Sequence, residues 1–220
     1  DIQLGKNKVT LSEVNEEDWA NEWKKYYKPV KVSDKVTIIP TWEEYEPVSS
    51  DEVIIEMDPG MAFGTGTHPT TVLSIQAIER FLNEEDLVLD IGAGSGILSV
   101  ASVLLGASEV LAYDLDEIAV SSTENNARLN QVEDRISARQ NDLLNGVDVK
   151  ADLIVSNILA EIIVRFTEDA YQLLKPGGYF ITSGIIQGKK EDVKQSLKNA
   201  GFEIVEVNQM EDWISIIATK

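Results

Sequence analysis

The residues best suited to bind a ligand lie in a glycine-rich loop, Gly92-Ala93-Gly94-Ser95-Gly96, which follows the apolar run Leu87–Ile91. Glycine lets the backbone turn sharply and lets a ligand lie against the main chain. A helical pattern follows at residues 96–105, so the loop joins a strand to a helix. Because open α/β sheets bind ligands at the carboxyl ends of their strands, we expect Gly92 and Gly94 to contact a cofactor.

Details of the loop decide between cofactors. The dinucleotide fingerprint G-x-G-x-x-G needs a third glycine at position 97, where this sequence has Ile97. Asp90 stands two residues before the first glycine, where its charge would disfavour a pyrophosphate and favour a cationic amino acid. No Gly-Lys-Ser/Thr follows, which excludes a P-loop.

Two more carboxylates follow the next two strands. Asp114 lies eighteen residues after Gly96 and is expected to accept hydrogen bonds from the ribose hydroxyls of an adenosine. Asp116 is expected to cap the helix at residues 117–129, although Asp114 could serve as that cap instead. Asp142 is placed to meet the adenine amino group, with Leu143 beside the ring, unless it is an ordinary loop aspartate.

Strands and helices alternate along most of the chain. Strands are predicted at Leu87–Ile91, Val110–Asp114, Ile136–Gln140, Leu153–Ser156, Tyr179–Ser183, Phe202–Val207 and Trp213–Ala218. Helices are predicted at about 70–82, 96–105, 117–129, 159–174 and 187–199. This alternation indicates a doubly wound, Rossmann-like α/β sheet that is mainly parallel. Only NQMED separates the last two strands, which are therefore expected to form a C-terminal antiparallel hairpin.

Composition limits the classes of protein and partner. The chain has 220 residues, a formal net charge of −19 and no cysteine, which excludes disulfides, thiolate catalysis and thiolate zinc sites. The strongly negative charge disfavours direct nucleic-acid binding and favours a basic partner. We expect no metal site, no membrane span, a monomer and a cytoplasmic location. Residues 1–50 are expected to be a linker and N-terminal remnant, and residues 51–220 the catalytic domain.

These motifs together resemble the class I methyltransferases. The resemblance rests on D-x-G-x-G-x-G, the acid after the second strand, the KPGG turn at Lys175–Gly178 and the final hairpin, and it covers residues 70–220. DPGMAFGTGTHPTT (Asp58–Thr71) and SNILAEII (Ser156–Ile163) more closely resemble the ribosomal protein L-11 methyltransferases, over residues 16–220. The resemblance implies S-adenosyl-L-methionine as cofactor and a basic ribosomal protein, methylated on lysine or α-amino nitrogens, as substrate. It also implies that most of a small substrate-recognition domain is missing.

The resemblance also implies which residues form the site. It marks Thr71, Gly92, Asp114 and Asn157 as cofactor contacts. Phe63, Gly64 and Thr65 belong to a loop suited to covering the methionine end of the cofactor, and Asn157 and Thr65 are the expected catalytic residues. Thr67 or Thr70 is expected to cap the following helix.

Asn157 bears on the kind of nitrogen methylated. In many amino-methylating relatives this position precedes Pro-Pro and an aromatic residue, whereas here Ile158-Leu159-Ala160 follows. That departure favours an aliphatic amine over an adenine or glutamine nitrogen, although Asn157 could simply bond backbone at the strand end. His68, the sole histidine, could take a proton from the amine, but a lone loop histidine is more often structural.

Three other functions remain open. The chain could be a class I methyltransferase that acts on another protein or on a nucleic-acid base. It could bind S-adenosyl-L-methionine without catalysis, although the complete Phe63–Thr71 loop argues against a pure binder. A dehydrogenase is the third alternative.

Overall fold

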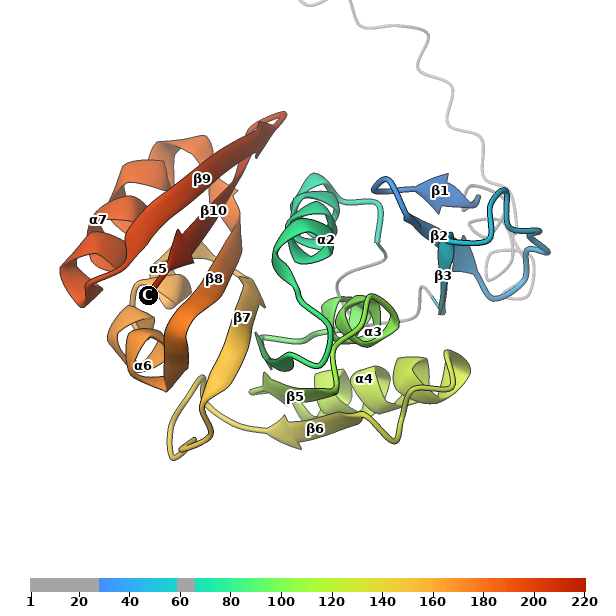
Figure 1. Cartoon of the computed structure of the whole chain (residues 1–220), viewed down its shortest axis with the longest axis horizontal. Coiled ribbons are helices and arrows are strands. Elements are labelled where there is room, and N and C mark those ends of the chain that lie inside the picture. Colours follow the sequence, from blue (N-terminus) through green and yellow to red (C-terminus); the bar gives the residue numbers. More distant parts are fainter. Residues whose placement is uncertain (1–27, 59–65) are drawn as a thin grey trace, which may run out of the picture.

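The computed structural model describes residues 28–58 and 66–220, which form an α/β fold with two sheets (Figure 1). The larger sheet has seven strands in the order β6-β5-β4-β7-β8-β10-β9. Their bounds are β4 (Leu87–Ile91), β5 (Glu109–Asp114), β6 (Ile136–Gln140), β7 (Ala151–Asn157), β8 (Leu174–Ile186), β9 (Glu203–Met210) and β10 (Trp213–Thr219). β10 runs in the direction opposite to the six other strands of this sheet, so the predicted mainly parallel sheet with a terminal antiparallel hairpin is confirmed.

Helices cover both faces of this sheet (Figure 1). One face packs against α2 (Pro69–Phe81), α3 (Ile97–Leu104) and α4 (Glu117–Leu129), and the other against α5 (Ala160–Ile163), α6 (Thr167–Leu173) and α7 (Lys190–Ala200). A 3-10 turn at Gln187–Lys189 precedes α7. Because both faces are buried, neighbouring residues such as Leu153 and Ile154 enter opposite cores, and the strands read as continuous apolar runs. In the described part of the chain, no helix is long and apolar enough to span a bilayer.

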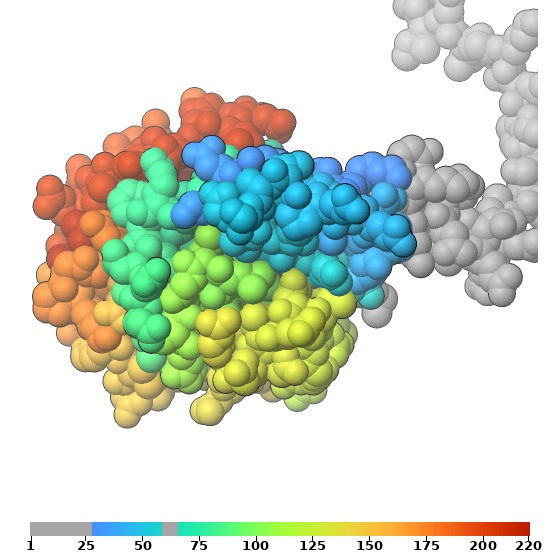
Figure 2. Space-filling model, turned by 45° about the vertical axis from the view of Figure 1, so that its right-hand side comes forward, coloured from blue at the N-terminus to red at the C-terminus, as the bar shows by residue number. Residues whose placement is uncertain are grey.

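The smaller sheet packs onto the helices of the first face. It consists of β1 (Val30–Lys31), β2 (Val36–Pro40) and β3 (Val53–Met57), with β2 and β3 parallel. Apolar residues of β2 and β3 join the core of α2, α3 and α4, and Figure 2 shows this region, in blue to cyan, lying directly over the green helices. The domain boundary predicted at residue 50 stays a prediction. In the structure, β2 lies before this boundary and β3 after it, and the two strands pair in one sheet.

The single helix expected over residues 159–174 is wrong. The structure has two short helices, α5 and α6, that are separated by Val164–Phe166. Ile162, Ile163 and Val164 are three consecutive β-branched residues, which propagate a helix poorly. Phe166 turns inward at the break and packs against Phe180 of β8, with ring centroids 5.8 Å apart. Burial of this aromatic side chain therefore accompanies the break in the helix.

The KPGG segment also differs from the prediction. Lys175–Gly178 was expected to be a turn before the strand, whereas β8 already begins at Leu174 and contains the segment. The pairing of β8 with β7 shifts register between Ala151 and Leu153, so the segment is an irregularity within the strand. Gly177 has φ of 80°, a left-handed conformation that glycine adopts without strain.

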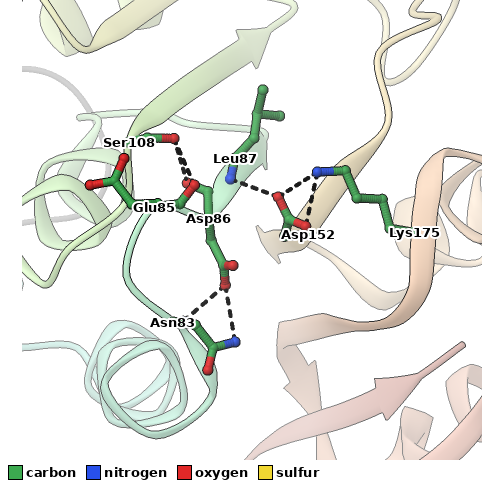
Figure 3. A network of polar contacts seen from close by, with 7 residues as sticks. All are labelled: Asn83, Glu85, Asp86, Leu87, Ser108, Asp152 and Lys175. Carbon is green, nitrogen blue, oxygen red and sulfur yellow. Dashed lines mark hydrogen bonds and ion pairs between the residues drawn. The ribbon is translucent and has the colours of Figure 1, made fainter.

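A polar network joins the amino ends of the central strands (Figure 3). Asp152 at the start of β7 accepts a hydrogen bond from the backbone N–H of Leu87 at 2.9 Å. The ammonium of Lys175 in β8 lies 2.8 Å from the same carboxylate, and the Ser108 hydroxyl donates to the carbonyl of Glu85 at 2.9 Å. The network fixes the starts of β4, β7 and β8 at the edge opposite the candidate site.

Replacing Asp152 by alanine should lower the free energy of unfolding by roughly 1–2 kcal/mol, because the Leu87 N–H loses its acceptor. Urea denaturation of the two proteins measures this difference. Glu124→Ala, which removes only the exposed Arg128–Glu124 pair, should change stability by no more than about 0.5 kcal/mol. Equal losses in the two variants would contradict the role given to Asp152.

Candidate functional site

A cavity of about 520 Å³ opens at the carboxyl ends of the parallel strands. Residues at or after the ends of β4, β5, β6 and β7, a glycine of β8, the start of α2 and the first residue of β10 form its wall. This size suits a nucleotide-sized ligand. Five residues that the sequence predicted as cofactor contacts line the cavity: Gly92, Gly94, Asp114, Asp142 and Asn157.

The glycine loop turns away from β4 through left-handed conformations. Gly92, Gly94 and Gly96 have φ of 77°, 57° and 77°. The backbone N–H of Gly92 donates to the carbonyl of Tyr113 at 2.8 Å, which docks the loop against the end of β5. Side chains are poorly tolerated in such conformations, which explains the glycines at these positions.

Asp114 connects the loop to the next helix. Its Oδ2 accepts from the N–H of Gly94 at 2.9 Å, and its Oδ1 accepts from the N–H of Asp116 at 3.0 Å. Each carboxylate oxygen can accept a further hydrogen bond, so Asp114 keeps acceptor capacity toward the cavity. Asp116 accepts from the N–H of Ile118 at 2.9 Å, which confirms it as the N-cap of α4.

Asp90 lies beneath the loop and does not line the cavity. Its side chain is only 1% exposed, and its Oδ2 accepts a hydrogen bond from the Ser99 hydroxyl at 2.6 Å. No hydrogen-bond partner for its Oδ1 is found among the described residues. Burial, opposed by the Ser99 hydrogen bond and aided by the charge of Asp114, raises the pKa of Asp90 from 3.8 to about 7.

This raised pKa sets the sign of a pH effect. The folded protein keeps the Asp90 proton up to about pH 7, whereas the unfolded chain releases it near pH 3.8. The folded state therefore binds more protons between these values, and stability falls as pH rises through this window, by at most about 1.4 kcal/mol per pH unit. Asp90→Asn should lack this pH-dependent loss of stability. Its stability relative to the parent protein should therefore increase as the pH rises from about 4 to 7. Urea denaturation of both proteins at several pH values measures it, and a constant difference would contradict it.

The segment after β6 forms another part of the wall. Asn141, Asp142 and Leu143 all line the cavity, and the N–H of Asn141 donates to the carbonyl of Asp114 at 2.8 Å. The Asn141 side chain donates to the carbonyl of Leu143 at 3.0 Å, and Leu143 has φ of 54°. Asp142 is therefore held close to the end of β5, and the exposed Leu115, which follows β5, also lines the cavity.

Asn157 at the end of β7 meets the start of α2. Its Nδ2 donates to Thr71 Oγ1 at 3.4 Å, and Asn157 lines the cavity, where Oδ1 can accept and the second Nδ2 hydrogen can donate. Thr71 is fully buried behind this wall, and the neighbouring Thr70 carbonyl accepts from the Ser74 and Ser183 hydroxyls. The structure thus brings Asn157 and Thr71 together, but only Asn157 lines the cavity, and the cofactor contacts of both residues stay predictions.

His68 has a different role at α2 from the one considered for catalysis. The predicted cap, Thr67 or Thr70, is wrong, because His68 is the N-cap and its Nδ1 accepts from the Thr70 N–H at 3.3 Å. Pro69 occupies the first helical position, so the cap falls on the residue before it. The His68 ring also meets the Trp213 ring edge-on at 4.9 Å, and both rings line the cavity.

Several wall residues had no assigned role in the sequence. They include Tyr113, Leu115, Ile158, Leu159, Ile162, Arg165, Gly184 and Trp213. Most are apolar residues beside the recognised motifs, and apolar residues next to strand ends are a usable signal for a ligand wall. Trp213 comes from the terminal hairpin, and only the three-dimensional pairing of β10 with β8 brings it to the site.

Ile158 is held between two glycines. A Cβ built on Gly92 would lie 2.4 Å from Ile158 Cγ2, and one on Gly184 would lie 2.3 Å from the Ile158 carbonyl oxygen. The chain after Asn157 therefore passes between the glycine loop and β8 with no space for a side chain on either. This close approach positions Asn157 between the two walls.

Gly184→Ala should be far more damaging than Gly177→Ala. Both glycines have nearly the same φ, 81° and 80°, but the Cβ of Gly177 would meet nothing within 4 Å. We expect Gly177→Ala to cost about 1–2 kcal/mol of stability for the left-handed backbone. Gly184→Ala should cost roughly a further 2 kcal/mol through the clash with Ile158. Urea denaturation compares them, and equal losses would contradict the tight packing of Ile158.

The comparisons with known proteins agree with this geometry. A family model described as ribosomal protein L11 methyltransferase matches residues 1–220. The chain belongs to this family. A protein named ribosomal protein L11 methyltransferase from Oceanobacillus iheyensis is 66% identical over 220 residues, which cover 100% of this chain and 70% of the relative. The Bacillus licheniformis protein of the same name is 66% identical, over 100% of this chain and 71% of its own length.

A solved structure resembles this family member closely. The crystal structure titled ribosomal protein L11 methylase from Lactobacillus delbrueckii subsp. bulgaricus has a TM-score of 0.84 and 38% sequence identity. The match covers 88% of this chain and 99% of that one. The family resemblance expected from the sequence motifs is therefore confirmed. Phe63, Gly64 and Thr65 lie outside the described residues, so their contacts stay predictions.

Proposed function

We propose that this family member transfers methyl groups from S-adenosyl-L-methionine to lysine or α-amino nitrogens of ribosomal protein L11. The observation that carries the proposal is the cavity in which Asp114, the glycine loop and Asn157 converge at the strand ends. The names of the relatives supply the substrate. The proposal keeps the cytoplasmic location and monomeric state predicted from the sequence.

The residues of the cavity fit the chemical groups of the cofactor. Asp114 has unused acceptor capacity for ribose hydroxyls, and Asp142 stands where an adenine amino group could donate. Leu115 and Leu143 offer apolar surfaces to the base, and Gly92 and Gly94 allow close approach of the ligand to the main chain.

The carboxylates also suit a cofactor that carries positive charge. Asp114 and Asp142 line the wall, and Asp90 lies behind it with one oxygen unpaired among the described residues. A cation brought near Asp90 would favour its ionised form, which burial otherwise penalises. We therefore assign Asp90 the role of stabilising the positive charge of the cofactor from behind the loop. Thr71 holds the Asn157 amide in place by accepting its hydrogen bond.

The remaining chemistry depends on how the chain presents a neutral amine. When bound, S-adenosyl-L-methionine supplies a methyl group activated by its sulfonium. The half-buried apolar side chains of Ile158 and Ile162 would reduce the hydration of an entering ammonium and so lower its pKa, which is near 10.4 in free lysine. Asn157 Oδ1, with Nδ2 directed to Thr71, can accept an N–H of the amine and so orient its lone pair.

Mass spectrometry of ribosomal protein L11 after incubation with the chain and S-adenosyl-L-methionine tests the proposal. We expect additions of methyl mass on lysine or α-amino nitrogens. Asn157→Ala should lower the rate by about a hundredfold or more if it orients the amine. Asn125→Ala, which removes an exposed side chain that accepts a hydrogen bond from Arg128 on the surface of α4, should leave the rate unchanged.

The outcomes separate the alternatives. No mass gain with the parent chain, despite cofactor binding by calorimetry, would indicate a binder without catalysis or another substrate. Absence of cofactor binding would overturn the assignment of the cavity itself.

A further inference from the structure

Helix α4 presents two buried polar side chains to the glycine loop. Thr123 is 0% exposed, and its Oγ1 donates to the carbonyl of Gly94 at 3.2 Å. Asn126 is 2% exposed, and its Nδ2 donates to the carbonyl of Ser95 at 2.8 Å. Neither residue lines the cavity, so any effect on a ligand must pass through the loop.

The loop is held from both sides. Asp114 accepts the N–H of Gly94 at 2.9 Å, while Thr123 donates to the carbonyl of the same residue. At Gly96 the helix comes so close that an added Cβ would lie 2.8 Å from Thr123 Cα. The two peptide groups that follow Gly94 and Ser95 are therefore fixed in orientation by contacts with α4.

Asn126 also links the loop to the smaller sheet. Its Oδ1 lies 3.5 Å from the N–H of Asp58, which directly follows β3. Asn130, at the C-cap of α4, accepts from the N–H of Glu56 and donates to its carbonyl with its side chain, both at 2.8 Å. The inner face of α4 thus bridges β3 and the glycine loop, and Asn126 takes part in both contacts.

A loop of this composition needs such support. Three of its five residues are glycines, which have no side-chain restriction on φ and lose the most conformational freedom on ordering. A loop that samples many conformations binds a ligand only while it is in the binding-competent conformation. The apparent affinity is therefore the intrinsic affinity multiplied by the fraction of molecules in that conformation. Hydrogen bonds from a rigid helix remove this loss before the ligand arrives.

We propose that Thr123 and Asn126 are positioning residues that preorganise the glycine loop for the cofactor. The inference rests on the proposed function, because it takes the cavity as the cofactor site. Loss of one such hydrogen bond, at about 1–1.5 kcal/mol, corresponds to roughly a tenfold weaker binding of the cofactor. The substrate protein does not meet the loop through these residues, so its KM should not change.

The decisive comparison is between Thr123→Val and Thr182→Val. Each variant keeps the shape of a fully buried threonine and removes one hydroxyl donor to a backbone carbonyl, Gly94 at 3.2 Å or Ile216 at 2.9 Å. Thr182 lies in β8, does not line the cavity, and donates to a carbonyl of β10 and not to the glycine loop. The two variants should lose similar thermal stability, which separates a general folding defect from a loop defect.

Calorimetry and steady-state kinetics then supply the readouts. Thr123→Val should raise the Kd and KM of S-adenosyl-L-methionine about tenfold, with kcat and the KM for the protein substrate within twofold. Thr182→Val should change none of these by more than about twofold. Thr123→Ser, which restores the hydroxyl, should recover the affinity. Asn126→Asp, which places a carboxylate against the Ser95 carbonyl, should weaken binding at least as much as Thr123→Val.

A measurement on the ligand-free protein keeps this inference distinct from the proposed function. Amide hydrogen exchange at Gly94 and Gly96 should accelerate in Thr123→Val and stay unchanged in Thr182→Val. Equal cofactor affinity in the two valine variants, or equal exchange at the two glycines, would overturn the positioning role. If the parent chain binds no cofactor, the proposed function fails, and the exchange comparison alone decides whether α4 holds the loop.

Discussion

The candidate site depends on one carboxylate at the end of β5. Asp114 accepts N–H groups from Gly94 and Asp116, so a single side chain holds the glycine loop and the residue that caps α4. The same side chain lines the cavity, where a ligand must use the lone pairs that remain. A carboxylate offers about four acceptor positions, whereas an amide oxygen offers two. The two backbone N–H groups would use both positions of an amide oxygen, so only a carboxylate keeps acceptor positions for a ligand here.

Much of the larger sheet could be predicted from the sequence, because its central strands β4, β7 and β8 are buried on both faces and contain apolar runs. The bounds predicted for β4 and β6 match the structure. The failures lie where tertiary contacts decide the local conformation. Phe166 is buried against Phe180 at the break between α5 and α6, and the KPGG segment is drawn into β8 by its pairing with β7. Neither contact has a local sequence signature.

The site was predictable to the extent that it lies in motifs at strand ends. Gly92, Asp114 and Asn157 converge because parallel strands bring their carboxyl ends to one edge of the sheet. Asp90 belongs to the same motif but does not line the cavity; it is buried on the α3 side of β4, where Ser99 donates to it. Trp213 could not be assigned from spacing alone, because a distant hairpin brings it to the site.

The position of β10 between β8 and β9 has a consequence for the order of assembly during synthesis. Both neighbours precede β10 in the chain, and in the described structure β9 pairs with no strand except β10. While the ribosome has yet to complete residues 213–219, β8 has an open edge and β9 has no partner. Such an edge invites pairing with other chains. The wall that contains Trp213 is therefore among the last parts of the cavity to form.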